Sequence, residues 1–118
     1  MKLRIKSDSI RYRLTRTNVN DLAEAGYIDD KVDFGGQALT YAIKATEDNV
    51  LKSTYENNKI TLLIPRSMVI ELQNTDKVGF ENTSGALHLL VEKDFTCLDN
   101  VSEDQSDNYP NPLAEKFL

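Results

Sequence analysis

The sequence predicts a mainly β (α+β) domain in which two ββαββ units form a small barrel, followed by an irregular C-terminal tail. Three observations lead to this prediction. The chain has 118 residues, a usual length for one domain. Several short segments alternate between apolar and polar residues, as half-buried strands do. Two stretches roughly fifty residues apart carry similar residues in the same order, which is typical of a duplicated unit.

The repeat is visible when the chain is aligned with itself. At an offset of 50 residues, segment 10–22 matches segment 60–72, with Val19 on Val69 and Leu22 on Leu72. At an offset of 46, segment 30–34 matches segment 76–80, and at 48, Ala38-Leu39 matches Ala86-Leu87. We therefore expect a single domain, 1–118, with repeat copies at 1–46 and 51–93. Residues 94–118 then form an acidic tail or arm.

In the first copy, the alternation predicts strands at 2–6 and 10–14, joined by a turn at Ser7-Asp8-Ser9. A helix of about two turns follows, with Thr17 as its N-cap and Gly26 at its C-terminal end. Strands at 32–34 and 38–45 come next, separated by a turn at Gly35-Gly36.

In the second copy, the same pattern predicts strands at 51–55 and 60–64, joined by a turn at Asn57-Asn58. The next helix has Ser67 as its N-cap and ends near Asn74, with a start one turn earlier, at Pro65-Arg66, as an alternative. The last two strands are expected at 78–80 and 86–92, on either side of a turn at 82–85.

A unit of this size cannot cover its own apolar face. Two copies packed about an approximate twofold axis cover each other. The expected result is a closed or nearly closed barrel, because closure also removes exposed sheet edges.

The second copy also contains an Ile64-Pro65 step, a short helix with Met68 and Leu72, and Asp76-Lys77-Val78 opening the next strand. This succession resembles the swapped-hairpin (AbrB/MazE-like) domain. In that family two hairpin units interlock as a dimer, so the resemblance implies a barrel of the cradle-loop or double-psi kind when both units share one chain. The link at 73–75 is shorter than the family pattern and lacks its glycine.

The whole chain resembles a family of small uncharacterised bacterial proteins, a domain of unknown function. At the start, the similarity lies in Lys2-x-Arg4-Ile5-Lys6 and in Ser9-Ile10-Arg11-x-Arg13-Leu14-Thr15. At the end, it lies in segment 91–95 and in Pro110-Asn111-Pro112. This resemblance implies no activity.

Composition favours a cytoplasmic protein. There is no apolar run of the length that spans a membrane, and the N-terminus lacks the apolar stretch of a signal peptide. A single cysteine, Cys97, excludes an internal disulfide and suits a reducing compartment. The net charge of −5 is uneven, because segment 1–16 holds six basic residues and one acidic residue.

The basic residues of the first two strands form the clearest candidate contact surface. Strand alternation places five of them on one outer face: Lys2, Arg4, Lys6, Arg11 and Arg13. This surface either contacts a polyanion or acidic partner, or is a solvated edge neutralised by nearby carboxylates. The second interpretation is favoured, because the chain is acidic and the face has no aromatic residue on which a base stacks.

Two alternatives describe the C-terminal segment. It is either a flexible acidic tail, which is favoured, or an arm anchored by the apolar residues Phe95, Leu98, Tyr109 and Leu113. Pro110 and Pro112 exclude a regular helix or a central strand there. In the second alternative the acidic residues of the arm cover the basic strands.

The residues that carry catalysis or bind metals are few. The only histidine is His88 and the only thiol is Cys97, so no zinc-ligand spacing is present. Asp29, Asp30 and Asp33 lack the regular acidic spacing of a calcium loop, and we expect them in a solvated turn. We therefore expect no metal, no cofactor and no catalytic residues.

The sequence thus favours a non-catalytic interaction domain that self-associates as a homo-oligomer or binds a protein partner. The alternative is a nucleic-acid binder or transcriptional regulator that uses the basic strands. A third and weaker hypothesis is an enzyme with a site in a barrel cleft, which requires that His88, Cys97 or the acids at 29–33 meet in one pocket.

Overall fold

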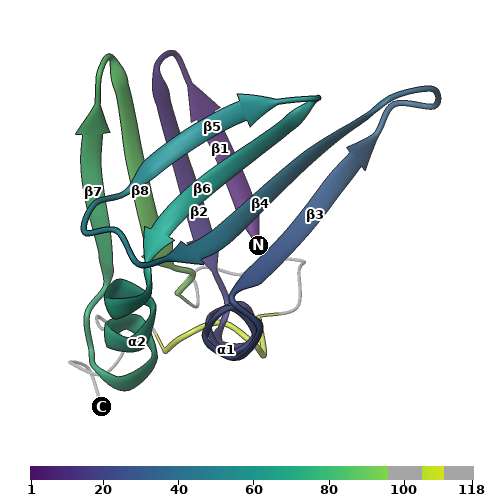
Figure 1. Ribbon diagram of the computed structural model, residues 1–118. Helices are drawn as coiled ribbons and strands as arrows, with labels where there is room; N and C mark the ends of the chain where they lie inside the picture. The colour runs from purple at the N-terminus through teal and green to yellow at the C-terminus, as the bar shows by residue number, and fades with distance from the viewer. Residues whose placement is uncertain (96–104, 111–118) are drawn as a thin grey trace.

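The computed structural model describes residues 1–95 and 105–110 and contains eight strands and two helices in these parts of the chain. Figure 1 shows the two helices together at one end of the strands. In chain order the elements are β1 (Lys2–Lys6), β2 (Ser9–Leu14), α1 (Arg16–Ala25), β3 (Tyr27–Asp33), β4 (Ala38–Thr46), β5 (Lys52–Glu56), β6 (Lys59–Pro65), α2 (Arg66–Asn74), β7 (Gly79–Ser84) and β8 (Leu87–Lys93).

The strands form two four-stranded sheets, and each sheet combines both halves of the chain. Their strand orders are β1-β2-β8-β7 and β3-β4-β6-β5. The central pairs, β2 with β8 and β4 with β6, are parallel, and the outer pairs are antiparallel hairpins. The fold is therefore a small α+β fold, as expected, in which each half depends on the other to complete its sheets.

A closed barrel is not formed, and this part of the prediction is wrong. The two sheets remain separate, and their strands diverge away from the helices (Figure 1). The edge strands β5 and β7 approach each other where β5 begins, and there the amide Nδ2 of Asn82 donates a hydrogen bond to the carbonyl oxygen of Leu51 at 2.9 Å. The divergence of the sheets beyond this point prevents a backbone ladder between these two edges.

The central parallel pairs have matching registers. In one sheet Ser9 lies opposite His88, and in the other Lys59 lies opposite Thr40. These pairs are related by the offsets of 50 and 48 residues that the sequence contains. Lys44 and Glu92 are equivalent at the offset of 48, and their partners in the neighbouring strands are Tyr27 and Gly79. Tyr27 is therefore equivalent to Gly79, and the offset of 46 does not relate equivalent strand positions.

The different links after the helices explain this shift. Gly26 ends α1 in the left-handed conformation, with φ of 76°, and turns the chain directly into β3 at Tyr27. After α2, Thr75 is extended and the chain runs on to Gly79 before β7 begins. The third strand, β3, is thus longer than the predicted 32–34, and the strand predicted at 78–80 begins one residue later, so Val78 lies outside β7.

The N-caps of both helices lie two residues before the predicted Thr17 and Ser67, and α2 has the alternative start that was predicted at Pro65-Arg66. Thr15 is the N-cap of α1, where its hydroxyl accepts from the N–H of Asn18 at 3.2 Å and the Asn18 side chain accepts from the N–H of Thr15 at 3.0 Å. Pro65 stands at the same place before α2. In the described part of the chain, neither helix has the length and apolarity to cross a membrane.

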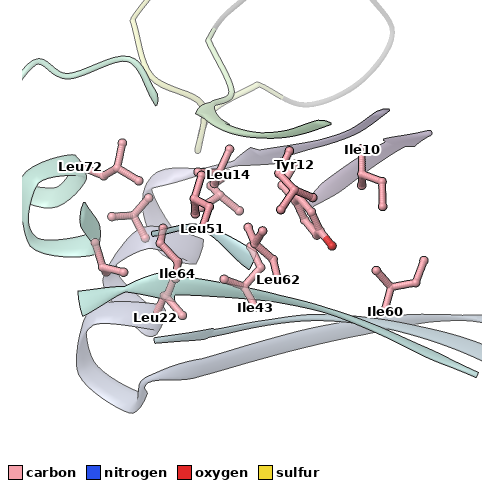
Figure 2. Packing of buried hydrophobic residues seen from close by; sticks show 14 residues of the cluster. Ile10, Tyr12, Leu14, Leu22, Ile43, Leu51, Ile60, Leu62, Ile64 and Leu72 are labelled. Carbon is pink, nitrogen blue, oxygen red and sulfur yellow. The ribbon is translucent and has the colours of Figure 1, made fainter. Parts of the chain in front are cut away.

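The core lies between the two sheets and is closed at one end by the helices (Figure 2). Alternating residues of β2 and β6 face each other there, with Tyr12, Leu14, Leu62 and Ile64 fully buried. The helices contribute equivalent pairs, Val19 with Leu22 and Val69 with Leu72. Burial raises the pKa of Tyr12 to about 12, and a weaker opposite effect comes from the Ser53 hydroxyl.

Gly79 provides a test of the β7–β8 register. A Cβ atom at this position would collide with the backbone carbonyl oxygen of Val91 and lie 2.9 Å from Cα of Glu92, whereas Gly36 has open space around it. We expect Gly79→Ala to lower the free energy of unfolding by about 1–3 kcal/mol. Gly36→Ala should change it by less than about 0.5 kcal/mol. Chemical denaturation followed by circular dichroism measures both, and equal effects would contradict the register.

Candidate functional site: a pocket between the helices and the C-terminal arm

The structure places the five predicted cations on one face of the β1–β2 hairpin. Lys2 lies opposite Arg13 and Arg4 lies opposite Arg11 across the two strands. The intervening pair, Leu3 with Tyr12, points to the other face, where Tyr12 is part of the core. Lys6 lies opposite Ser9 at the end of this outer face.

Glu92 of strand β8 and Asp94, just after this strand, supply carboxylates that neutralise part of this charge. One oxygen of Glu92 lies 3.1 Å from Nε of Arg13 and 3.5 Å from Nε of Arg11. The ammonium group of Lys2 lies 3.2 Å from the buried carboxylate of Asp94. Arg4 and Lys6 make no ion pair within residues 1–95 and 105–110. The five cations and these two acids together carry a net charge of +3.

The other predicted residues do not come together. His88 lies 3.3 Å from a carboxylate oxygen of Glu81 and 3.3 Å from the hydroxyl of Thr83, on the half-exposed outer face of β8. Asp29, Asp30 and Asp33 lie in strand β3 and not in a turn, so the alternation of the strand directs Asp30 to the opposite face from the other two. Cys97, Leu98 and Leu113 lie outside the described residues.

Residues 105–110 form an arm segment that contacts α1 and the end of β8. Phe95 and Tyr109 form a parallel β-bridge, and their rings meet edge to face with centroids 6.2 Å apart. The N–H of Tyr109 donates to the carbonyl oxygen of Asp94 at 2.9 Å. The predicted cover of the basic hairpin by acids therefore does not hold for Asp107, which binds at the N-terminus of α1.

Asp107 accepts hydrogen bonds from the first turn of α1. Its backbone oxygen accepts from the N–H of Arg16 at 3.1 Å, and its carboxylate accepts from the hydroxyl of Thr17 at 2.9 Å and from the N–H of Thr17 at 3.3 Å. Hydrogen bonding by Thr15 and Thr17, together with the charge of Arg16, lowers the pKa of Asp107. A carboxylate is also favoured at this end of a helix by the helix dipole.

The arm closes one side of a pocket of about 650 Å3 between the C-terminal end of α2 and the N-terminal part of α1. Two cations in its wall contact the ring of Tyr109, with Arg16 at 5.4 Å and the ammonium group of Lys93 at 4.8 Å from the centroid. The neighbouring helices are joined across it by a hydrogen bond of 3.2 Å from Gln73 to Asn20. The pocket thus has two basic groups, an aromatic face and amide groups in one wall.

Lys93 is the unusual residue of this site. Its ammonium group donates to the carbonyl oxygen of Thr75 at 2.8 Å, at the C-terminal end of α2, where a cation is favoured. The residue is only 6% exposed. Burial lowers the pKa of Lys93, and the charge of Asp76 opposes this effect.

This pocket was not among the sites predicted from the sequence. One indication of the pocket is present in the sequence at the end of β8. The alternate, buried positions of this strand are Leu89, Val91 and then Lys93, a lysine where an apolar residue is expected. The other walls come from α1, α2 and the arm, and no local pattern indicates that these segments meet.

The fold is a small α+β domain with two open sheets, and within residues 1–95 and 105–110 no three His, Cys, Asp or Glu side chains gather in a way that could hold a metal ion. The chain belongs to a family of unknown function (DUF7009), whose model matches residues 1–113. Comparison with curated proteins and with solved structures gives no match.

The contacts of Asp107 predict a pH-dependent arm. Because the pKa of Asp107 is lower when the arm is docked, docking is most stable above the ordinary aspartate pKa and weakens as the pH falls below about 4. Thr17→Val removes one hydrogen bond, so it should raise the pKa of Asp107. Carboxyl-carbon NMR titration measures this change, and an unchanged midpoint would contradict the contact.

Proposed function

We propose that this protein is a non-catalytic interaction domain that forms homodimers through the open end of its two sheets. The open end is the surface formed by Ile5, Val32, Phe34, Leu39 and Tyr55, away from the helices. The observation that carries the proposal is the exposure of four of these apolar side chains, whereas Leu39 is half-buried beside them against the core. Ile5 is 55% exposed, Phe34 70% and Tyr55 66%.

The strand registers give these side chains a common orientation. Ile5 lies opposite Ile10 in one sheet and Tyr55 lies opposite Ile60 in the other. Ile10 and Ile60 both belong to the core, whereas their partners Ile5 and Tyr55 are exposed, so the facing surfaces of the sheets continue past the core. Exposed apolar surface of this kind on a soluble domain marks an interaction site.

The β3–β4 hairpin extends this surface. Strand β6 pairs with β4 only from Thr40 onward, so Val32 and Leu39, which pair with each other, lie on a two-stranded tip. A two-stranded ribbon is marginally stable in water unless its apolar face is packed. Figure 1 shows this tip reaching beyond the other strands, which makes it available to a second molecule.

Charge favours a second copy of this chain as the partner. The segment that leads to the tip carries Asp29, Asp30 and Asp33 with one lysine, whereas the β1–β2 hairpin at the same open end carries the excess of cations. In a twofold dimer the acidic tip of one protomer meets the basic hairpin of the other, and the same contact occurs twice. Such complementarity guides association and fixes the register.

We also propose that the two halves arose by duplication and remain related by an approximate twofold axis, in the manner of swapped hairpins. The equal registers of the parallel pairs support this relation, as do the equivalent buried pairs on α1 and α2. In this view one chain holds an internal pair of units, and the homodimer is a second level of association.

Substitution at the tip tests the homodimer. Val32→Asp places a charge in the proposed interface and should weaken self-association by about 10-fold or more, because a buried unpaired charge costs more than 1.4 kcal/mol. Val50→Asp is the matched control, since Val32 is 43% and Val50 44% exposed and Val50 lies in the loop before β5.

Light scattering after size exclusion, over a range of protein concentrations, measures the dimer fraction of each variant. The proposal requires a dimer in the natural sequence and in Val50→Asp, and a shift to monomer in Val32→Asp. A natural chain that stays monomeric at all concentrations would overturn the homodimer.

A second candidate function is polyanion binding by the β1–β2 hairpin. It is supported by the direct opposition of Arg4 and Arg11, since like charges opposite each other destabilise a sheet. A phosphate backbone would relieve this repulsion. Arg4 and Lys6 have no ion-pair partner in the described parts of the chain, so they are the cations most available to a polyanion.

Binding to a labelled DNA duplex tests this second function. The double variant Arg4→Ala, Lys6→Ala should weaken binding and reduce the slope of log affinity against log salt concentration by about 1.8, as expected for two lost phosphate contacts. The matched control is Lys31→Ala, Lys44→Ala, which removes the same charge from the other sheet. Absence of binding at low salt, or equal losses in both variants, would exclude the hairpin as a nucleic-acid site.

A further inference from the structure

We propose that the pocket between α1, α2 and the arm binds a small organic anion with a flat apolar body, held by Lys93 and Arg16. This site is separate from the open end and from the basic hairpin, so it goes beyond the functions proposed above. The ligand class is a small aromatic or similarly flat carboxylate or phosphate.

The position of Lys93 is the first argument. Lys93 lies opposite Leu14 at a core-facing position of β8, and the equivalent position in the other sheet is Ala45, opposite Ile64. The backbone is the same at both places, because the N–H of Lys93 donates to Val78 and that of Ala45 donates to Gly26, each at 2.9 Å. The equivalent position in the other sheet thus accommodates a small apolar side chain, that of Ala45. Packing at this position therefore does not require a lysine.

The hydrogen bonding of Lys93 is the second argument. An ammonium group has three N–H donors. Within residues 1–95 and 105–110 the ammonium group donates a hydrogen bond to the carbonyl oxygen of Thr75, and its second contact is with the ring of Tyr109. A buried cation is costly unless its donors are satisfied. An anion in the pocket satisfies the remaining donors and offsets this cost.

The shape and lining of the pocket are the third argument. Its volume of about 650 Å3 suits a small molecule and not a polymer. Val78, Phe95, Tyr109 and Pro110 give it an apolar and aromatic wall, opposite polar groups that include Asn20 and Gln73. An aromatic body packs on such a wall, with rings offset or edge to face.

The charge balance selects an anion. Arg16 and Lys93 line the pocket together with one carboxylate, Asp76, so the lining side chains carry a net charge of +1, and the carboxylate of Asp107 interacts with Arg16 from outside this lining. The N-terminus of α1 is occupied by Asp107, which leaves the two cationic side chains to hold the ligand. Aromatic contact and two cations then distinguish a flat organic anion from a simple inorganic one.

The test uses benzoate and phenyl phosphate as probes in amide NMR titrations of the full chain. We expect saturable shifts at the amides of Asn20, Val78 and Lys93, with a dissociation constant of about 1 mM for probes of this size. Benzylamine, which has the same ring and the opposite charge, should give no saturable shifts, and sulfate should bind more weakly than phenyl phosphate.

Two substitutions locate the site. Lys93→Met should weaken benzoate binding by about 10-fold or more, because it removes a charged hydrogen bond. Lys59→Met is the matched control, since Lys59 also lies 4.8 Å from the centroid of a tyrosine ring, that of Tyr27, but on the other sheet. If Lys93→Met does not fold, Arg16→Gln on the exposed first turn of α1 gives the same comparison.

Each result is decisive for this pocket. Loss of binding in Lys93→Met or Arg16→Gln with retention in Lys59→Met supports the site. Absence of saturable shifts, equal binding of benzylamine, or benzoate binding that survives both pocket substitutions overturns it and leaves Lys93 as a structural clamp between α2 and the arm. The oligomeric state of the same samples tests the homodimer independently.

Discussion

The parallel pairing of β2 with β8 and of β4 with β6 is the constraint on which the structure depends. A hairpin from the first half completes each sheet only with a hairpin from the second half. The core between the sheets therefore forms only when both of these parallel pairings are made. The ends of the parallel strands also position the helices, the arm and Lys93, so the pocket follows from the same pairing.

Local patterns were enough to predict the α+β class and the approximate places of the strands and the two helices. The alternation at Ile10, Tyr12 and Leu14 predicted an inward face that is buried, and Gly26 ends α1 as its backbone freedom suggests. The pairing partners were not predictable, because side-chain alternation indicates which face is buried and not which strand lies beside it. The predicted closure of the strands into a barrel was wrong for this reason, because closure depends on the relative angle of the two sheets.

The candidate site was predictable only in part. The five cations were placed on one face correctly by alternation, but their partner Glu92 lies on β8, which is distant in sequence. Lys93 was not selected, although it interrupts an apolar alternation, because a lysine at a strand end usually reaches solvent. Tyr109 contacts the ammonium group of Lys93 from a segment for which an anchored arm was the less favoured of two predictions.

The pairing between hairpins from the two halves of the chain also affects how the chain reaches its native state. The sheet that contains β1 and β2 needs β8, and Ser9 pairs with a residue 79 positions later, His88. Contacts of such long sequence separation slow folding, because the chain entropy is lost before the contacts form. During synthesis neither sheet is complete until β6 or β8 has left the ribosome, so the nascent chain exposes unpaired strand edges for most of its translation.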